Sequence, residues 1–100
     1  MAEMAFAGEV GAIIDLQLVP VDGEMREDHI LFSESNSRFI IEVALEKVDD
    51  VTAILDGVPY AVIGKTTGTG RVVVESASGV VVDEDIFEMK EAWQAPLRAL

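Results

Sequence analysis

The chain of 100 residues contains no cysteine and few aromatic residues. The absence of cysteine excludes disulfides, thiolate metal sites and a cysteine nucleophile. Because only 6% of the residues are aromatic, a hydrophobic core must be built mainly from Val, Ile, Leu and Ala. Half of the residues are nevertheless hydrophobic, which excludes an intrinsically disordered chain.

Basic residues are also scarce: seven stand against nineteen acidic residues, which gives a net charge of −12. A field of this sign repels phosphate backbones and anionic lipid, so the composition argues against binding to nucleic acid or to a membrane surface. The bases are scattered along the chain and form no stripe. Any contact with a phosphate group would therefore involve one or two side chains at a defined site.

The chain lacks long apolar runs as well. Its longest hydrophobic stretches are only a few residues, far short of the roughly 20 needed to span a membrane. Residues 1–10 contain no basic segment of the kind that opens a signal peptide. We therefore expect a soluble, cytoplasmic protein that forms a single domain over residues 1–100.

Helix-forming composition and helical spacing predict four helices. They cover residues 1–7, 24–32, 48–56 and 85–100. We expect Gly8 and Gly57, in the left-handed conformation, to end the first and third helices. In the last helix, Asp85 and Glu88 match a carboxylate version of the capping box. Pro96 is expected to kink or end its last turn.

Alternating or β-branched stretches predict five strands. They cover residues 12–19, 38–45, 60–67, 71–76 and 80–82. In the second of these, alternate residues from Phe39 to Leu45 share one apolar face. The last three are separated by short glycine-containing turns, so we expect them to be adjacent antiparallel strands. The order of elements predicts an α+β sandwich, with one mixed β-sheet packed against helices.

A run of polar residues separates the second predicted helix from the second predicted strand. Within it, the carboxylate of Glu34 could accept hydrogen bonds from a ligand, and the hydroxyls of Ser35 and Ser37 could donate to a phosphate. Arg38 offers a bidentate fork for a carboxylate or phosphate. Alternatively, the hydroxyls cap the turn and Arg38 pairs with Glu34 or Glu42. The residues alone leave both interpretations open.

Other chemically suggestive features have simpler explanations than catalysis. Gly64-Lys65-Thr66 resembles the end of a phosphate-binding loop, but Pro59 stands where that pattern needs glycine and the segment is predicted as a strand. An edge or bulge glycine followed by a solvated lysine is the simpler interpretation. His29, the only histidine, could bind a metal only with carboxylates such as Asp28 or Glu34. No activated serine accompanies it, so a solvated helix histidine is the default.

Over nearly its whole length the chain resembles the phosphoribosylformylglycinamidine synthase family, at the second AIR synthase-like C-terminal domain of the large subunit. The resemblance rests on the segments AEMAFAGEVGAIIDL, LFSESNSRFIIEV, PYAVIGKTT and the EAW of the last helix. The A-x-I-G-K pattern is shared by the wider AIR synthase superfamily, whereas Ser-Glu-Ser…Ser-Arg-Phe is typical of this synthase. The implied fold is an AIR synthase C-terminal-domain-like sandwich. The resemblance further implies that this sandwich is incomplete at its N-terminal edge, because the family's aspartate-glycine-glycine loop before the first helix has no counterpart in the sequence.

The resemblance implies that the chain is a fragment or subunit of an ATP-dependent carbon-nitrogen ligase of purine biosynthesis. The family converts formylglycinamide ribonucleotide to the amidine, using ATP, Mg²⁺ and ammonia derived from glutamine. The implied partners are the remaining synthase domains, a glutaminase subunit and a small accessory subunit. Self-association through an exposed sheet face or the first helix is a further alternative.

The same resemblance implies where a ligand would bind. A loop like Ser33-Glu34-Ser35 contacts substrate in one half of the family's duplicated subunit, and its equivalent in the other half relates to an auxiliary nucleotide. Glu34, Ser35, Ser37 and Arg38 are therefore expected to contact substrate or nucleotide. The family's catalytic histidines, magnesium carboxylates and ATP-binding lysine lie in domains absent here. We accordingly expect no catalytic residue, no metal site, no bound cofactor and no activity in this chain alone.

Two alternatives to this assignment stay open. The chain could belong to another enzyme of the superfamily, such as a selenophosphate synthase, a thiamine-phosphate kinase or a hydrogenase-maturation protein, although the run from Ser33 to Phe39 argues against it. It could also be a non-catalytic assembly module that reuses the fold.

Overall fold

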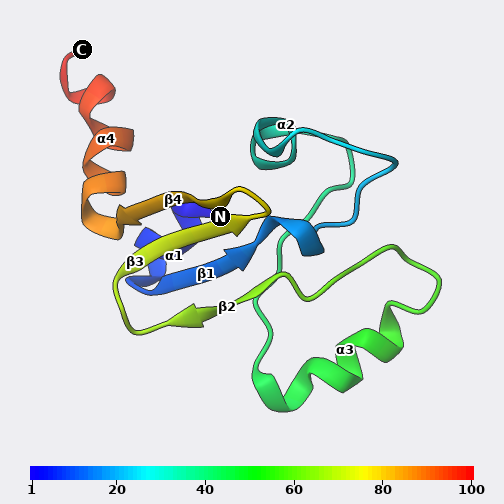
Figure 1. Cartoon of the computed structure of the whole chain (residues 1–100). Coiled ribbons are helices and arrows are strands. Elements are labelled where there is room, and N and C mark those ends of the chain that lie inside the picture. The colour runs from blue at the N-terminus through cyan, green and yellow to red at the C-terminus, as the bar shows by residue number, and fades with distance from the viewer.

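A computed structural model describes all 100 residues as a four-stranded mixed sheet with short helices (Figure 1). The elements are α1 (Ala2–Gly8), β1 (Gly11–Asp15), the 3-10 turn η1 (Leu16–Leu18), α2 (Glu27–Phe32), the 3-10 turn η2 (Leu45–Lys47), α3 (Val48–Ile54), β2 (Gly64–Thr67), β3 (Arg71–Ser76), β4 (Gly79–Asp85) and α4 (Ile86–Arg98). The predicted α+β class with one mixed sheet is confirmed. None of the helices combines the length and hydrophobicity needed to cross a membrane.

The strand order in the sheet is β2-β1-β3-β4. β1 is antiparallel to β2 and parallel to β3, and β3 is antiparallel to β4. The prediction that β2 and β3 are adjacent was therefore wrong, although their relative direction was right. The turn between them passes the start of β1, where Gly11 fits because it has no side chain. A Cβ atom there would lie 2.6 Å from the backbone oxygen of Arg71.

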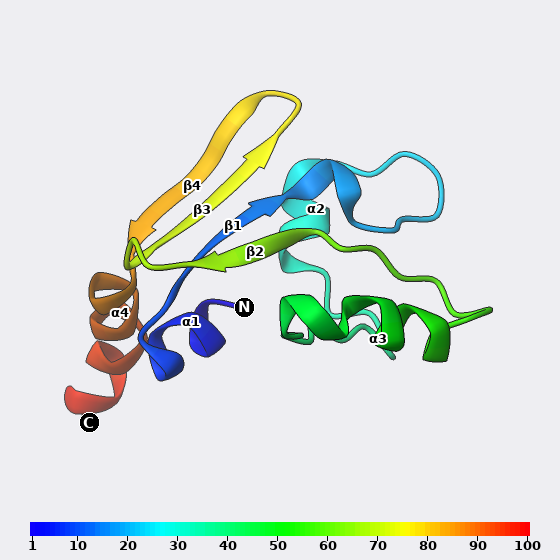
Figure 2. The ribbon, with the colours of Figure 1, turned by 90° about the horizontal axis from the view of Figure 1, so that it is seen from below.

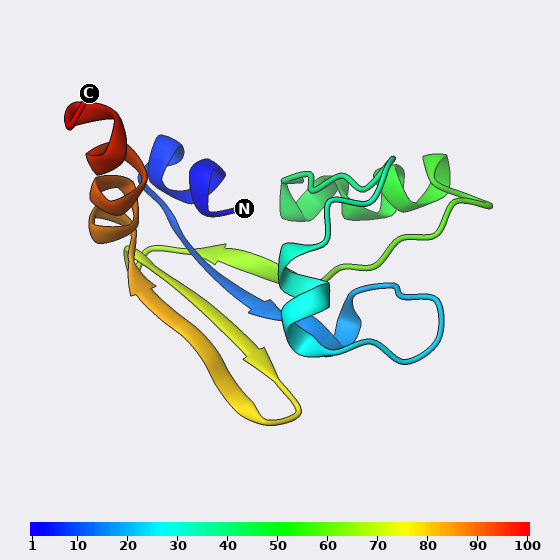
Figure 3. The same ribbon diagram turned by 90° about the horizontal axis from the view of Figure 1, so that it is seen from above.

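The hydrophobic core is small and lies where α1 and the start of α4 meet β1 and β3. It consists of eight buried side chains: Ala5, Phe6, Ala12, Ile14, Leu16, Val72, Val74 and Ile86. At its margin, the rings of Phe6 and Trp93 lie 5.7 Å apart between α1 and α4, which run close together in Figure 3. Along α4, Ile86 is buried and Met89 packs against the core, whereas Leu97 is exposed. Side chains of α4 thus pack against the core only in the first half of the helix.

Two predicted strands are not formed as expected. Residues 38–44 have no regular structure, and of residues 60–67 only Gly64–Thr67 pairs with a neighbour. No backbone hydrogen bond involves residues 34–43. A strand requires a neighbouring strand to satisfy its backbone groups, and nothing in this chain lies beside residues 38–44 in that way. The sequence pattern is present, but the pairing that would make it a strand is absent.

Other element boundaries also differ from the predictions. β1 ends at Asp15, whose side chain accepts a hydrogen bond from the backbone N–H of Gln17 at 2.9 Å and so begins η1. α2 begins at Glu27 rather than at residue 24. At the end of α1, Glu9 and not Gly8 has the left-handed conformation, with φ of 54°. Gly57 is left-handed as predicted, but it does not end α3, which already ends at Ile54 with Leu55 as its C-cap.

The start of α4 agrees with the sequence prediction, and its end does not. The carboxylate of Asp85 accepts hydrogen bonds from the backbone N–H groups of Phe87 and Glu88, at 2.8 and 3.1 Å. This is the predicted N-cap. Pro96 lies inside the helix, which continues to Arg98, so the proline does not end it.

Candidate ligand loop

The polar loop begins at the C-terminus of α2, and Arg38 folds back onto that helix end. The backbone N–H of Ser33 donates to the carbonyl of His29 at 3.0 Å. Arg38 donates from Nη1 to the carbonyl of Ser33 at 3.0 Å and from Nη2 to the carbonyl of Ile30 at 2.6 Å. The last carbonyls of a helix lack partners within the helix. The guanidinium supplies partners there and places a positive charge at the negative end of α2.

The other polar side chains of the loop lie at the surface. The hydroxyls of Ser33 and Ser35 share a hydrogen bond of 2.7 Å, and Ser37 has the left-handed conformation, with φ of 61°. Glu34 is exposed and takes part in no hydrogen bond or ion pair. Arg38 pairs with neither Glu34 nor Glu42, so that part of the alternative interpretation was wrong. Its guanidinium binds backbone carbonyls instead.

An open hollow of about 330 Å³ lies beside the loop, over α2. Its lining residues are Met25, Asp28, His29, Phe32 and Ser33. The loop thus contributes only Ser33, and the structure does not bring Glu34, Ser35, Ser37 and Arg38 together around a common cavity. His29 is exposed, as expected for a solvated helix histidine.

The carboxylates near the loop do not form a metal centre. Asp28 is already paired with Arg26 at 2.8 Å. Nowhere in the chain do three His, Asp or Glu side chains lie close enough together to hold a metal ion. The residues of this chain therefore do not by themselves fit the Mg²⁺ that the family resemblance implies for the whole enzyme.

A contact that sequence reasoning missed fixes the position of α2. The carboxylate of Glu27 accepts hydrogen bonds from the hydroxyl of Ser76 at 2.6 Å and from that of Ser78 at 2.9 Å. Both serines lie on the β3–β4 hairpin, so the contact ties α2, and with it the start of the polar loop, to the sheet. These two hydrogen bonds lower the pKa of Glu27. No local signal could have found the contact, because its partners are 49 and 51 residues apart.

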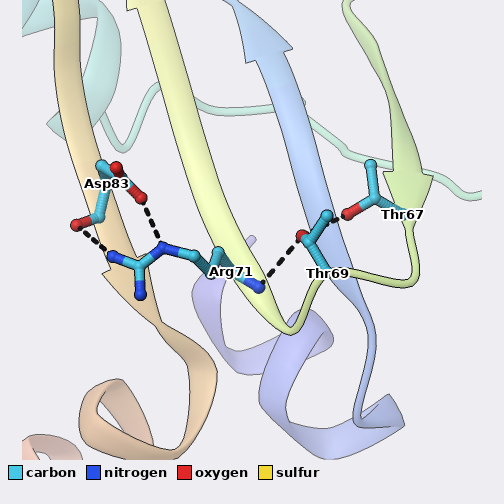
Figure 4. Close-up of polar contacts among 4 residues, drawn as sticks. All are labelled: Thr67, Thr69, Arg71 and Asp83. Carbon is cyan, nitrogen blue, oxygen red and sulfur yellow. Dashed lines mark hydrogen bonds and ion pairs between the residues drawn. The ribbon is translucent and has the colours of Figure 1, made fainter.

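At the other end of the sheet, a second polar cluster closes the turn between β2 and β3 (Figure 4). The hydroxyls of Thr67 and Thr69 lie 2.8 Å apart, and the hydroxyl of Thr69 accepts from the backbone N–H of Arg71. Arg71 donates from Nε to the carboxylate of Asp83 at 2.7 Å. This hydrogen bond and charge pairing raise the pKa of Arg71. The cluster satisfies its own polar groups and joins β3 to β4.

Gly64 has a structural role in the sheet. A Cβ atom at this position would lie 1.9 Å from the backbone oxygen of Ile13, so only glycine permits β1 and β2 to approach this closely. Lys65 is exposed on the same edge strand. The interpretation of this segment as an edge glycine followed by a solvated lysine is confirmed, because a phosphate-binding loop would require a helix after it.

Together, the fold and the loop define a small α+β domain with a surface-exposed polar loop. Residues 1–77 match the family described as AIR synthase related protein, C-terminal domain. The chain belongs to this family, which confirms the resemblance seen in the sequence.

Three curated relatives of the chain share one name. The chain is similar to phosphoribosylformylglycinamidine synthase subunit PurL of Alkaliphilus metalliredigens (34% identical, 100% of this chain), of Deinococcus radiodurans (36%, 100%) and of Methanopyrus kandleri (40%, 93%). It spans only 13% of the length of each of these relatives. No solved structure matches the chain significantly.

Proposed function

We propose that this chain is the C-terminal domain of the large subunit of a phosphoribosylformylglycinamidine synthase, an ATP-dependent carbon-nitrogen ligase of purine biosynthesis. The observation that carries the proposal is the similarity of the entire chain to two synthase subunits at 34% and 36% identity. Membership of the AIR synthase C-terminal family supports it. The proposed location is the cytoplasm.

The proposed role of the chain is to provide scaffold and one wall of a substrate or nucleotide cleft. The complete enzyme would convert formylglycinamide ribonucleotide to the amidine, with ATP activating the amide oxygen and ammonia from glutamine attacking. ATP and Mg²⁺ would be held by other parts of the enzyme, since this chain has no converging set of metal ligands. Its proposed partners are the remaining synthase domains, a glutaminase subunit and a small accessory subunit.

Within that wall, Glu34, Ser35, Ser37 and Arg38 are the proposed ligand contacts. Glu34 supports this role because its exposed carboxylate has no partner in the chain. Arg38 uses its Nη1 and Nη2 groups on carbonyls. A guanidinium has five N–H donors, so three remain for a phosphate or carboxylate. In the free chain, Arg38 therefore holds the loop against α2 and still has a positive charge and free donors for an anionic ligand.

The proposed function is tested with a chimera of the Deinococcus radiodurans subunit, in which its matching stretch is replaced by this chain. We expect the chimera to form amidine from formylglycinamide ribonucleotide, ATP and ammonia. An inactive chimera that is folded and binds ATP would contradict the proposal.

The loop is tested in the same chimera by the substitution Glu34→Gln. Loss of one hydrogen bond to a charged group costs about 1.5 kcal/mol or more, so we expect KM for the ribonucleotide or for ATP to rise about tenfold. Glu84→Gln makes the same change at an exposed carboxylate on β4, outside the loop, and should leave both KM values unchanged. Equal behaviour of the two variants would exclude Glu34 as a ligand contact.

A further inference from the structure

A 26-residue region of the chain carries much exposed apolar surface and no fully buried side chain. Residues 38–63, which we call the arm, contain no buried residue. Eight large apolar side chains are exposed there: Phe39, Ile40, Ile41, Leu45, Ile54, Val58, Tyr60 and Val62. Phe39 and Leu45 are 84% and 89% exposed. Figure 2 shows α3, in the middle of the arm, standing apart from the sheet. Side chains this apolar and this exposed indicate a contact surface.

The arm also leaves backbone groups unpaired. Within the arm, residues 38–43 and 59–62 take part in no backbone hydrogen bond. In the first of these segments, Phe39, Ile41 and Val43 would share one face of a strand and Ile40 would lie on the other. Apolar residues on both faces are typical of a strand that is covered on both sides. An extended segment of this kind can add to the edge of another sheet, gaining main-chain hydrogen bonds and burying its side chains.

We propose that the arm is the docking surface for the remaining part of the synthase subunit, and that residues 39–43 become a strand of a sheet formed with it. This inference rests on the proposed function. The relatives' subunits contain much more chain than the 13% that this sequence matches, so a partner of the required size exists in them. Docking would cover the apolar side chains of the arm and satisfy its backbone.

The charge of the arm argues against a second copy of the chain as its occupant. Its five acidic residues outnumber its two basic ones, Arg38 and Lys47, and the whole chain has a net charge of −12. Two arms brought together would repel each other, whereas a neutral apolar surface would not be repelled and a basic one would be attracted. The partner surface is thus expected to be apolar at its centre, with a neutral or basic rim.

Amide hydrogen exchange tests the inference directly. The probe is the Deinococcus radiodurans subunit from which the stretch matched by this chain has been deleted, mixed with the full chain. Successive amides in a strand point to opposite sides. Pairing on one side should therefore slow exchange at every second residue of 39–43, and pairing on both sides should slow it at all of them. We expect exchange at the paired amides to be at least tenfold slower in the mixture than in the chain alone, where no amide of residues 39–43 should be protected.

Two matched substitutions separate the arm from the rest of the surface. Ile41→Lys places a charge in the arm at a side chain that is 62% exposed, and Val80→Lys does so on β4 at one that is 59% exposed. Neither removes a core contact, so both variants should fold, which circular dichroism checks. We expect Ile41→Lys to weaken binding to the probe at least tenfold and Val80→Lys to leave it unchanged.

The possible failures are distinguishable. Slow exchange at residues 39–43 in the chain alone, increasing with concentration, would identify a second copy as the occupant and overturn the inference. A complex that leaves these amides unprotected, or that binds Ile41→Lys normally, would overturn it and leave the proposed function intact. If no complex forms although the chimera is active, the inference fails alone. If the chimera is inactive as well, the proposed function fails with it.

Discussion

At the scale of single residues, Glu9 is held in a backbone conformation that side chains avoid. Its φ is 54°, and its backbone N–H bonds to the carbonyl of Ala5 to close α1. The left-handed conformation costs a residue with a Cβ atom roughly 1–2 kcal/mol. Glycine avoids this strain, but part of the gain is offset because glycine has more conformational freedom to lose on folding. We expect Glu9→Gly to raise the free energy of unfolding by about 1 kcal/mol, measured by urea denaturation.

Glu9→Ala is the matched control, because it removes the carboxylate but keeps the Cβ atom. Glu9→Ala should give only a small part of the stabilisation expected for Glu9→Gly. If alanine stabilised the chain as much as glycine does, the cause would be the acidic charge at the helix end and not the backbone conformation.

Glu27 makes the stability of the chain depend on pH. The hydrogen bonds from Ser76 and Ser78 lower its pKa in the folded state, so the folded state favours the charged form. The resulting stabilisation is fully present above the pKa of the unfolded chain and is lost as the pH falls through the lowered value. We expect Glu27→Gln to have a lower Tm than the wild type at neutral pH, and this difference to shrink in acid. A Tm difference that does not change with pH would contradict this account.

At the scale of elements, the approach of β1 to β2 depends on Gly64. An added methyl group would lie 1.9 Å from the oxygen of Ile13 and would push the strands apart. We expect Gly64→Ala to destabilise the chain by about 3 kcal/mol, the upper part of the range for overpacking, as measured by denaturant unfolding. Gly68→Ala is the control, since its Cβ would meet nothing within 4 Å. Equal losses for the two variants would show that close packing at Gly64 is not the cause.

Elements whose signals are local were predictable from the sequence, and those that depend on distant partners were not. The N-cap at Asp85 could be identified because its partners, Phe87 and Glu88, are two and three residues away. The apolar alternation of residues 38–45 gave a strand prediction that was wrong, because the pattern specifies faces and not a neighbour. Turn signals likewise predicted that the chain reverses between β2 and β3, but not that β1 lies between them.

The same limit applies to the candidate loop. Its polar composition made Glu34, Ser35, Ser37 and Arg38 visible as a group. The sequence did not indicate which two carbonyls Arg38 binds, because that contact depends on how the loop folds back onto α2. The tie from Glu27 to the β3–β4 hairpin joins residues about fifty positions apart, and a single sequence contains no signal for such a pair.

At the scale of the whole molecule, the chain buries little and extends far. Only nine of its 100 residues are buried. Its radius of gyration is 14.8 Å, against about 13 Å for a compact domain of this length. The arm, whose helix α3 stands away from the sheet in Figures 2 and 3, contributes to both features. Such a chain gains stability from whatever covers the arm, which connects its shape to the proposal that it works inside a larger subunit.

The most direct test of that proposal is the rate of amidine formation in a reconstituted mixture. The Deinococcus radiodurans subunit lacking the matched stretch would be assayed with formylglycinamide ribonucleotide, ATP and ammonia, with and without this chain. The same subunit supplied with its own missing stretch is the positive control. We predict that neither component is active alone and that the mixture is. Turnover by this chain alone, or an inactive mixture beside an active control, would contradict the account.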